Sequence, residues 1–278
     1  MGSGAIIARL GKGISLSEAP IGTFSPTPLQ SAIIKFARTA GLGNGAVRNY
    51  GAIAVTKIRP APVDFDYYGL TLRLYPTLYP SARHMLFTPV WSEYHERAFI
   101  LRHLPKNGNF VDVGANAGLF LFAIAALRRD CKVLAFEPMD DYASILNFNI
   151  RANKLDNVIV EPVALSDADG EVMIDRATKS ILSGRGVTTV KSARLQSVLA
   201  KHGLGRIDVL KIDVEGVEDR VLMPFFRATQ PSVWPRAVVM EICFREHWQE
   251  DCLAYMLANG YSQVFRHGLN VGLVRPSG

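Results

Sequence analysis

A glycine-containing segment with an acid before it holds the residues of this chain that are best placed to bind a ligand. The segment Phe110-Val-Asp-Val-Gly-Ala-Asn-Ala-Gly118 ends a strand-like apolar run and begins a helix-like one. Small residues let a ligand approach the backbone, and the first N–H groups of a helix are free to bind it. Gly114 and Gly118 are four positions apart and follow Asp112, unlike the G-x-G-x-x-G pattern of dinucleotide enzymes. Such an acid suits an ammonium and a sulfonium group better than a pyrophosphate.

Glu137 is a second acid in a position suited to a nucleotide. It closes the apolar run Leu134-Ala-Phe-Glu-Pro138, 19 residues beyond Gly118. In nucleotide-binding α/β folds, an acid at this place accepts hydrogen bonds from the ribose hydroxyls. Ala164, in the loop after the third strand, is then expected against the adenine. Helix capping or a surface ion pair is the alternative interpretation of Asp112 and Glu137.

The run Ile207-Asp-Val-Leu-Lys-Ile-Asp-Val-Glu-Gly216 places charged residues in an apolar strand. Alternation along an extended strand puts Lys211, Asp213 and Glu215 on one face. A buried lysine is costly unless it is paired, so we expect Lys211 to bind one of these carboxylates. Our hypothesis is that Asp213 or Glu215 orients or deprotonates a substrate hydroxyl while Lys211 fixes that carboxylate. A purely structural ion pair is the alternative.

Glu241 ends the next strand-like run and is expected at the same sheet edge. With Asp213 and Glu215 it could offer oxygen ligands to Mg²⁺ or Mn²⁺. Ligand type alone does not demand a metal ion, so no metal site is predicted. We therefore count Glu241 with Lys211, Asp213 and Glu215 as candidate catalytic residues.

These residues must be positioned by alternating strands and helices. Short apolar runs predict buried parallel strands at 109–114, 131–137, 157–163, 207–213 and 236–242. Two further short strands are expected at 171–175 and 187–191. Residues 261–267 and 271–275 flank a turn and predict a closing antiparallel hairpin. The chain from 105 to 278 is therefore predicted to form one α/β domain.

Residues 1–104 are predicted to be an extension of that domain. Their patterns favour a flexible terminus over the first 25 residues, then a helix from Pro28, a β-hairpin at 63–67 and 70–74, and a helix at 92–104. The extension is a candidate lid over the substrate. Its aromatic side chains either line the substrate pocket or pack the hairpin onto the main sheet.

The composition is that of an ordinary folded protein. Of the 278 residues, 49% are hydrophobic and 20% are charged, which excludes collagen-like and disordered chains. Three cysteines without a CxxC pair argue against a disulfide framework or a thiolate zinc site. No secretory signal is expected, because the N-terminus has too few apolar residues for one. No membrane span is expected either, because polar residues interrupt the longest apolar stretch, 110–127. The expected location is the cytoplasm.

Positive charge is concentrated in the N-terminal part of the chain. Residues 1–110 carry 12 lysines and arginines against 5 acids. This surplus either attracts an anionic partner or forms a solvated basic face. Since no nucleic-acid-binding module is visible, we expect a small-molecule or saccharide partner, with an anionic group on it left open, and no nucleic acid. The sequence does not define the oligomeric state.

Five sequence blocks, taken together, are typical of a known family. They are Val111-Asp-Val-Gly-Ala-Asn-Ala-Gly118, Phe136-Glu-Pro138, Asn149-Ile-Arg-Ala-Asn153, Ala164-Leu-Ser-Asp167 and Lys211-Ile-Asp-Val-Glu-Gly-Val-Glu218. In these blocks the chain resembles the FkbM family of S-adenosylmethionine-dependent methyltransferases, and the resemblance covers residues 62–275. Many members have an aspartate before the fourth strand where this chain has Leu195-Gln196, so no function is assigned to that position.

The resemblance implies a Rossmann-like class I methyltransferase fold, with a seven-stranded, mostly parallel sheet whose last strand is antiparallel. It implies S-adenosylmethionine as the cofactor and O-methylation of a hydroxyl on a sugar, polysaccharide or natural product. Carried over to this chain, the cofactor-binding residues are Asp112, Gly114, Ala115, Asn116, Gly118, Glu137, Ala164 and Asp213. Lys211, Asp213, Glu215 and Glu241 would face the reacting centre.

Two other functions stay open at this point. An NAD(P)-dependent oxidoreductase would use the same kind of sheet, although Asp112 and the spacing of Gly114 and Gly118 disfavour it. A non-catalytic nucleoside-binding protein would keep the loop, but it would have no need of charged residues on the fourth strand.

Overall fold

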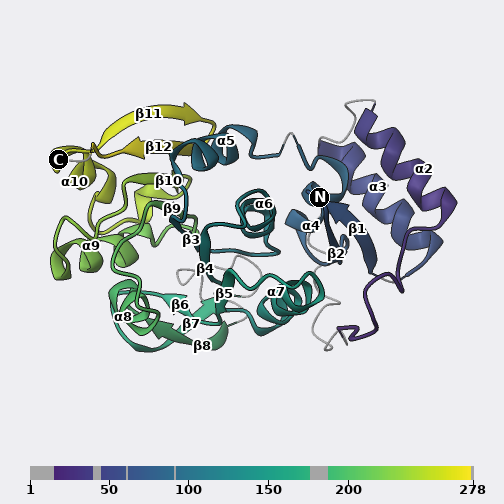
Figure 1. The fold of residues 1–278 in the computed structure, drawn as a ribbon, viewed down its shortest axis with the longest axis horizontal. Helices are drawn as coiled ribbons and strands as arrows, with labels where there is room; N and C mark the ends of the chain where they lie inside the picture. The colour runs from purple at the N-terminus through teal and green to yellow at the C-terminus, as the bar shows by residue number, and fades with distance from the viewer. Residues whose placement is uncertain (1–15, 40–44, 61, 91, 176–186, 277–278) are drawn as a thin grey trace.

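The computed structural model describes residues 16–39, 45–60, 62–90, 92–175 and 187–276 (Figure 1). Within these ranges the main sheet has seven strands in the order β11-β12-β10-β9-β3-β4-β5. The strands are β3 (Asn109–Val113), β4 (Lys132–Phe136), β5 (Val158–Glu161), β9 (Val209–Ile212), β10 (Ala237–Glu241), β11 (Ser262–His267) and β12 (Asn270–Val274). β12 runs antiparallel to both of its neighbours, and the others pair in parallel. This topology confirms the predicted fold.

The sheet is covered by helices on both faces because successive residues of its strands point to opposite sides. Phe110, Val133 and Val209 belong to one apolar cluster, whereas their neighbours Val111 and Leu134 belong to another. The first cluster contains side chains of α5 (Tyr94–His103), α6 (Leu119–Leu127) and α7 (Asp140–Ala152). The second contains side chains of α8 (Leu195–Lys201), α9 (Glu218–Ala228) and α10 (Cys252–Ala258). A short 3-10 helix, η1 (Arg245–His247), precedes α10.

A second, smaller sheet follows β5. It has the order β6-β8-β7 and consists of β6 (Ala164–Leu165), β7 (Gly170–Asp175) and β8 (Val187–Ala193). The expected third strand, 157–163, therefore ends at Glu161, and the chain joins the small sheet at Ala164. Residues 176–186 lie outside the described residues.

The N-terminal extension contains more helices than we predicted. The structure has α2 (Pro28–Thr39), α3 (Gly45–Ile58), β1 (Val63–Tyr67), β2 (Leu70–Leu74), α4 (Pro80–Phe87) and α5. Helices α2 and α5 and the hairpin confirm the predicted elements. Helix α3 escaped notice because glycines and β-branched residues obscure its helical pattern, and α4 because it is only 8 residues long. None of the described helices is long and apolar enough to span a bilayer.

Two asparagines dock the hairpin onto the main domain. Asn149 on α7 accepts a hydrogen bond from Arg73 N at 2.7 Å and donates to Arg73 O at 3.2 Å. Asn153 pairs in the same way with the backbone of Thr71. These contacts satisfy the outer edge of β2. They also give a physical reason for the Asn149–Asn153 block noted in the sequence.

A buried ion pair holds the chain that precedes the hairpin. Arg73 Nε lies 2.8 Å from Asp64 Oδ1, and both side chains are almost fully buried. Asp64 also accepts hydrogen bonds from the backbone of Gly22 and Phe24, while Arg73 donates to the carbonyls of Ser17, Ala19 and Pro20. Residues 16–25, which we expected to be loose, are thus anchored, and residues 1–15 lie outside the described part.

Candidate active site

The glycines of the loop after β3 occupy positions that no other residue fits. Gly114 has a φ of 81°, and a Cβ atom there would lie 2.0 Å from the carbonyl oxygen of Asp213. Gly118 has a φ of 89°, and its Cβ would lie 2.5 Å from the ring of Phe122. The loop therefore depends on both glycines, Gly114 for contact with the end of β9 and Gly118 for the start of α6.

Hydrogen bonds tie this loop to the end of β4. The N–H groups of Gly114 and Ala115 donate to Phe136 O at 3.1 and 2.9 Å. Asn116 adopts the left-handed conformation, with a φ of 54°, and its N–H donates to Glu137 Oε2 at 2.9 Å. The other oxygen of Glu137 accepts from Met139 N at 3.0 Å. The loop and the acid predicted to bind one cofactor are thus in direct contact.

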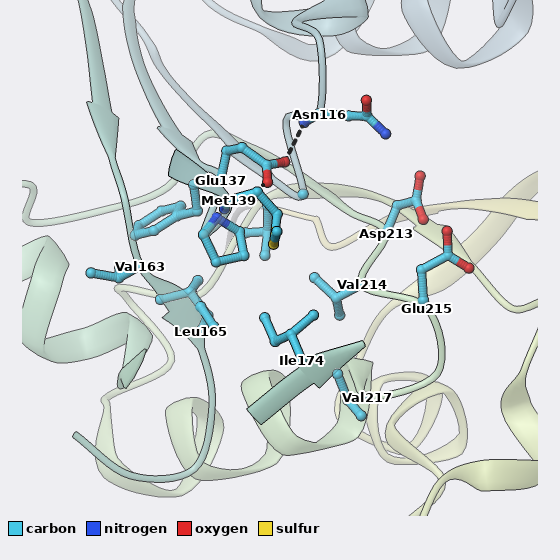
Figure 2. Close-up of a pocket in the computed structure, with 15 residues that line it drawn as sticks. Asn116, Glu137, Met139, Val163, Leu165, Ile174, Asp213, Val214, Glu215 and Val217 are labelled. Carbon is cyan, nitrogen blue, oxygen red and sulfur yellow. Dashed lines mark hydrogen bonds between the residues drawn. The ribbon is translucent and has the colours of Figure 1, made fainter. Parts of the chain in front are cut away.

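A first cavity of about 660 Å³ lies between this loop and the ends of β4, β6 and β9. Figure 2 shows Glu137 on one side of it, Asp213 and Glu215 on the other, and Val163, Leu165 and Ile174 as an apolar wall. Ala164 also lines this cavity. An apolar slot with a carboxylate is the kind of surface that binds a nucleoside.

A second cavity of about 810 Å³ lies between α4 and the carboxyl ends of β9 and β10. The extension contributes Pro80, Ser81, His84 and Glu93 to its wall, and the main sheet contributes Lys211, Asp213, Val239 and Glu241. Gly114, Asn116 and Asp213 line both cavities. The hydroxyl of Ser81 donates to Asn116 Oδ1 at 2.7 Å, which joins the extension to the glycine loop. The two cavities are therefore neighbours that share a wall.

Lys211 is a buried cation with several oxygen partners. Its Nζ donates to Gly114 O at 2.9 Å and lies 3.5 Å from both Asp112 Oδ1 and Asp213 Oδ2. Asp112 faces it because the two residues are register partners on β3 and β9. Burial alone would lower the pKa of Lys211, but attraction to Asp213 and Asp112 outweighs it, so the pKa is raised. Lys211 therefore stays charged and holds Asp213 at the shared wall.

Asp112 is placed differently from the other predicted cofactor residues. Its side chain is fully buried, which raises the pKa of its carboxyl group, and the charge of Lys211 partly offsets this effect. Asp112 and Gly118 line neither of the two cavities, whereas Ala115 lines the second. A direct contact of Asp112 with a ligand's ammonium group stays a prediction.

Glu241 and Asp213 form a carboxyl pair at the carboxyl ends of β10 and β9. Burial raises the pKa of Glu241 to about 9, and the charge of Asp213 and a hydrogen bond with it act in the same direction. Glu241 therefore keeps its proton near neutral pH and donates a hydrogen bond to Asp213. Glu215, with a φ of 58°, lies in the turn after β9 and lines only the first cavity of the two. Because β9 ends at Ile212, extended alternation does not describe the position of Glu215.

The sequence model of the methyltransferase FkbM domain family matches residues 112–262 of this chain, which is more than half of its 278 residues. The chain belongs to the FkbM methyltransferase domain family. This confirms the resemblance seen in the sequence, and the strand order given above is the one that the resemblance implied.

Individual relatives of this FkbM-family chain are distant. It is 28% identical over 167 residues to the methyltransferase sdnD of Sordaria araneosa, covering 46% of this chain and 64% of that protein. It is 30% identical over 137 residues to ribosomal RNA small subunit methyltransferase G of Beutenbergia cavernae, covering 44% of this chain and 64% of the relative. The chain thus spans less than two thirds of either relative's length. A solved structure, M. jannaschii TYW2 in complex with AdoMet, is similar with 18% identity and a TM-score of 0.41, over 77% of this chain and 84% of that one.

Glu93 is a residue of this FkbM-family site that sequence reasoning missed. It has a φ of 52°, lines the second cavity and lies within electrostatic reach of Asp213. Burial raises the pKa of Glu93, and the charges of Glu96 and Asp213 raise it further. Asn270 donates to Glu93 Oε2 at 3.3 Å and to Glu96 Oε1 at 3.1 Å. A strained acid in a cleft is a typical functional feature, but its strain is visible only in the folded backbone.

His84 is a second missed residue of the second cavity. Its Nδ1 lies 2.6 Å from Ser92 Oγ and 3.3 Å from an Nη atom of Arg48. Burial lowers the pKa of His84 to about 4, and the charges of Arg48 and Arg83 act in the same direction. The imidazole is therefore neutral near pH 7.

No group of three or more His, Cys, Asp or Glu side chains in the described ranges is arranged to hold a metal ion. Asp213, Glu215 and Glu241, which the sequence suggested as oxygen ligands by type, do not form such a group. Asp213 instead pairs with Lys211, and Glu241 forms a hydrogen bond with Asp213.

Proposed function

We propose that this chain is an S-adenosylmethionine-dependent O-methyltransferase that acts on a hydroxyl of a sugar, polysaccharide or natural product. The observation that carries the proposal is the shared wall of the two cavities. One cavity is apolar with a carboxylate suited to ribose, and the other is lined by acids that can bind a hydroxyl. Membership of the FkbM methyltransferase domain family supports the same reaction class.

The residues of the first cavity fit the proposed cofactor. Gly114 exposes backbone to this cavity, Glu137 offers carboxylate oxygens, and Val163, Leu165 and Ile174 offer an apolar surface to an adenine ring. When bound, S-adenosylmethionine supplies an electrophilic methyl group. Asn116 and Asp213, which line both cavities, would stand where donor and acceptor meet.

Asp213 is the residue that we propose to act on the acceptor hydroxyl. Lys211 fixes one side of its carboxylate, and the protonated Glu241 donates a hydrogen bond to it. Asp213 accepts the hydrogen bond of the hydroxyl and takes its proton as the hydroxyl oxygen forms the new C–O bond. The remaining task of the protein is to hold that oxygen in line with the donor's methyl–sulfur bond, which would break as the C–O bond forms and leave S-adenosylhomocysteine. Glu93, from the extension, lines the same cavity and would also contact the acceptor.

We propose that residues 1–104 close the acceptor site of the domain formed by residues 105–278. This proposal is supported by the polar residues that the extension contributes to the second cavity. The interpretation that aromatic side chains of the extension line the substrate pocket receives less support, because Tyr67 and Phe87 are buried in the apolar core and do not line that cavity. The oxidoreductase and nucleoside-binding alternatives leave the carboxylates around Asp213 without a task.

A methyl-transfer assay with radiolabelled S-adenosylmethionine tests the proposal. The acceptor panel contains sugars, hydroxylated natural products and, because one relative is named for ribosomal RNA, an RNA fragment. We expect label to enter a hydroxyl as a methyl ether, and Asp213→Asn to lower turnover by about 10²–10⁴-fold, far more than it weakens binding of S-adenosylhomocysteine. Methylation of RNA alone, or full turnover by Asp213→Asn, would contradict it.

A further inference from the structure

We propose that Arg48 and Arg83 form an anion-binding subsite beside the second cavity, so that the acceptor carries a carboxylate, phosphate or sulfate group in addition to its reacting hydroxyl. The two arginines lie on the neighbouring helices α3 and α4, and both are half-buried. This inference rests on the proposed function, because it names the class of molecule that the second cavity accepts.

The two guanidinium groups have no acidic partner among the described residues. Arg48 contacts His84 Nδ1 at 3.3 Å, and Arg83 donates to Asn49 Oδ1 at 2.6 Å. The buried Nε atom of Arg83 has no hydrogen-bond partner within the described part of the chain. By contrast, Arg73 in the same extension is bound by Asp64 and by backbone carbonyls. Each guanidinium has five N–H donors and no described acid accepts from either group, so Nη donors remain for a ligand, although the buried Nε of Arg83 is not one of them.

The surroundings of Arg48 contain a second positive charge and no paired acid among the described residues. Burial lowers the pKa of Arg48, and the nearby charge of Arg83 lowers it further. Burial also lowers the pKa of Arg83. The third group of the cluster, His84, is neutral and cannot offset either charge. A bound anion would remove this repulsion, and planar guanidinium groups match the oxygens of carboxylates and phosphates.

The position of the cluster defines how an acceptor would lie. His84 lines the second cavity, and Arg48 lies directly against its ring. The other wall of the cavity carries Asp213, whose charge would repel an anion, and the protonated Glu241 beside it, and both side chains can bind a hydroxyl. The acceptor would therefore place its anionic group toward α4 and its hydroxyl toward the sheet edge. This arrangement uses the positive surplus of residues 1–110 for a specific purpose.

His84 provides a reporter for the proposed subsite. The groups facing its ring are Arg48 from α3, Arg83 from α4 and the hydroxyl of Ser92. The six histidines are labelled with isotopes, the His84 ring signals are assigned through His84→Gln, and inorganic phosphate is titrated against sodium chloride at equal ionic strength. We expect a saturable shift with phosphate alone, and a rise in the pKa of His84, because bound phosphate offsets the two arginines.

Matched variants test whether the two arginines bind the phosphate. Arg48→Gln and Arg83→Gln should each weaken phosphate binding by at least about tenfold. Lys57→Gln, which removes an exposed charge from the same helix α3, should leave it unchanged. In the acceptor panel, a hydroxy acid should have a lower KM than its neutral methyl ester.

Several results would overturn the subsite. They are a phosphate response no larger than that of chloride, a phosphate affinity of both arginine variants equal to that of the wild type, or a KM for the ester as low as that of the acid. S-adenosylhomocysteine is titrated in parallel to separate this inference from the proposed function. Cofactor binding without a phosphate response rejects the subsite alone, and a phosphate response without cofactor binding rejects the methyltransferase proposal alone.

Discussion

At the residue scale, Asp213 owes its properties to two neighbours of opposite kind. The charged Lys211 lies 3.5 Å from it, and Glu241 retains a proton because it is buried beside the Asp213 charge. Such an arrangement keeps one carboxylate available at the shared wall while limiting the repulsion between the two acids. The same arrangement has a measurable consequence for stability.

Glu241→Gln should stabilise the protein more at alkaline than at acidic pH. The pKa of Glu241 is about 9 in the folded state against an ordinary value of 4.5, so its stabilising contribution is complete below 4.5 and declines up to about 9. Glutamine has no such titration. After allowance for solvent screening, we expect its advantage in Tm to grow by about 2–4 °C between about pH 5 and about pH 8. Calorimetric scans at both pH values measure this, with exposed Glu246→Gln as the control. The same Tm difference at both pH values would refute the expectation.

Gly114→Ala should disrupt the site through a steric clash and not through backbone strain alone. Gly114 and Gly69 have nearly equal φ angles, 81° and 80°, but a Cβ would meet Asp213 O at Gly114 and nothing within 4 Å at Gly69. Gly69→Ala should therefore cost about 1–2 kcal/mol of unfolding free energy. Gly114→Ala should cost more and abolish binding of S-adenosylhomocysteine. Chemical unfolding and calorimetric titration of both variants give the comparison, and similar behaviour of the two would contradict this account.

At the element scale, the strands of the main sheet could be predicted from the sequence, but the part of the second cavity formed by Glu93 and Asn270 could not. The predicted strands of the main sheet were correct to within two residues, because buried parallel strands are short apolar runs. Glu93 and Asn270 could not be paired in advance, since they are 177 positions apart and only the folded sheet brings them together. Strand alternation could not place Glu215, because β9 ends at Ile212 and Glu215 lies in the turn that follows.

Arg73→Met should separate a structural arginine from those proposed to bind an anion. It leaves the buried carboxylate of Asp64 without its partner and releases the carbonyls of Ser17, Ala19 and Pro20. We expect a loss of about 3–5 kcal/mol in unfolding free energy. Arg227→Met, at the exposed pair with Glu250, should cost about 0–1 kcal/mol. Urea unfolding measures both, and an equal cost would argue against the anchoring of the hairpin by Arg73.

At the scale of the whole molecule, the extension and the main domain share one apolar core. The same cluster contains Ile34 and Phe87 of the extension and Leu121 and Phe122 of α6. Besides the role at the acceptor site proposed above, the extension therefore packs against the main domain's helices.

Removal of residues 1–90 should thus unfold the chain instead of merely opening the acceptor site. Exposure of Leu121 and Phe122 would remove the apolar packing on α6, next to the glycine loop. We expect loss of cooperative thermal unfolding together with loss of S-adenosylhomocysteine binding. Near-ultraviolet circular dichroism and calorimetric titration test this. A truncated chain that unfolds cooperatively and binds the cofactor product normally would instead support an independent main domain.

The most direct test of the account is a calorimetric titration of the purified protein with S-adenosylmethionine, S-adenosylhomocysteine and NADH. We predict that the first two bind and NADH does not, and that Glu137→Gln weakens binding by about 10–100-fold, because it replaces a charged hydrogen-bond acceptor in the first cavity. Binding of NADH alone, or equal affinity of wild type and Glu137→Gln, would contradict the assignment of the first cavity to S-adenosylmethionine.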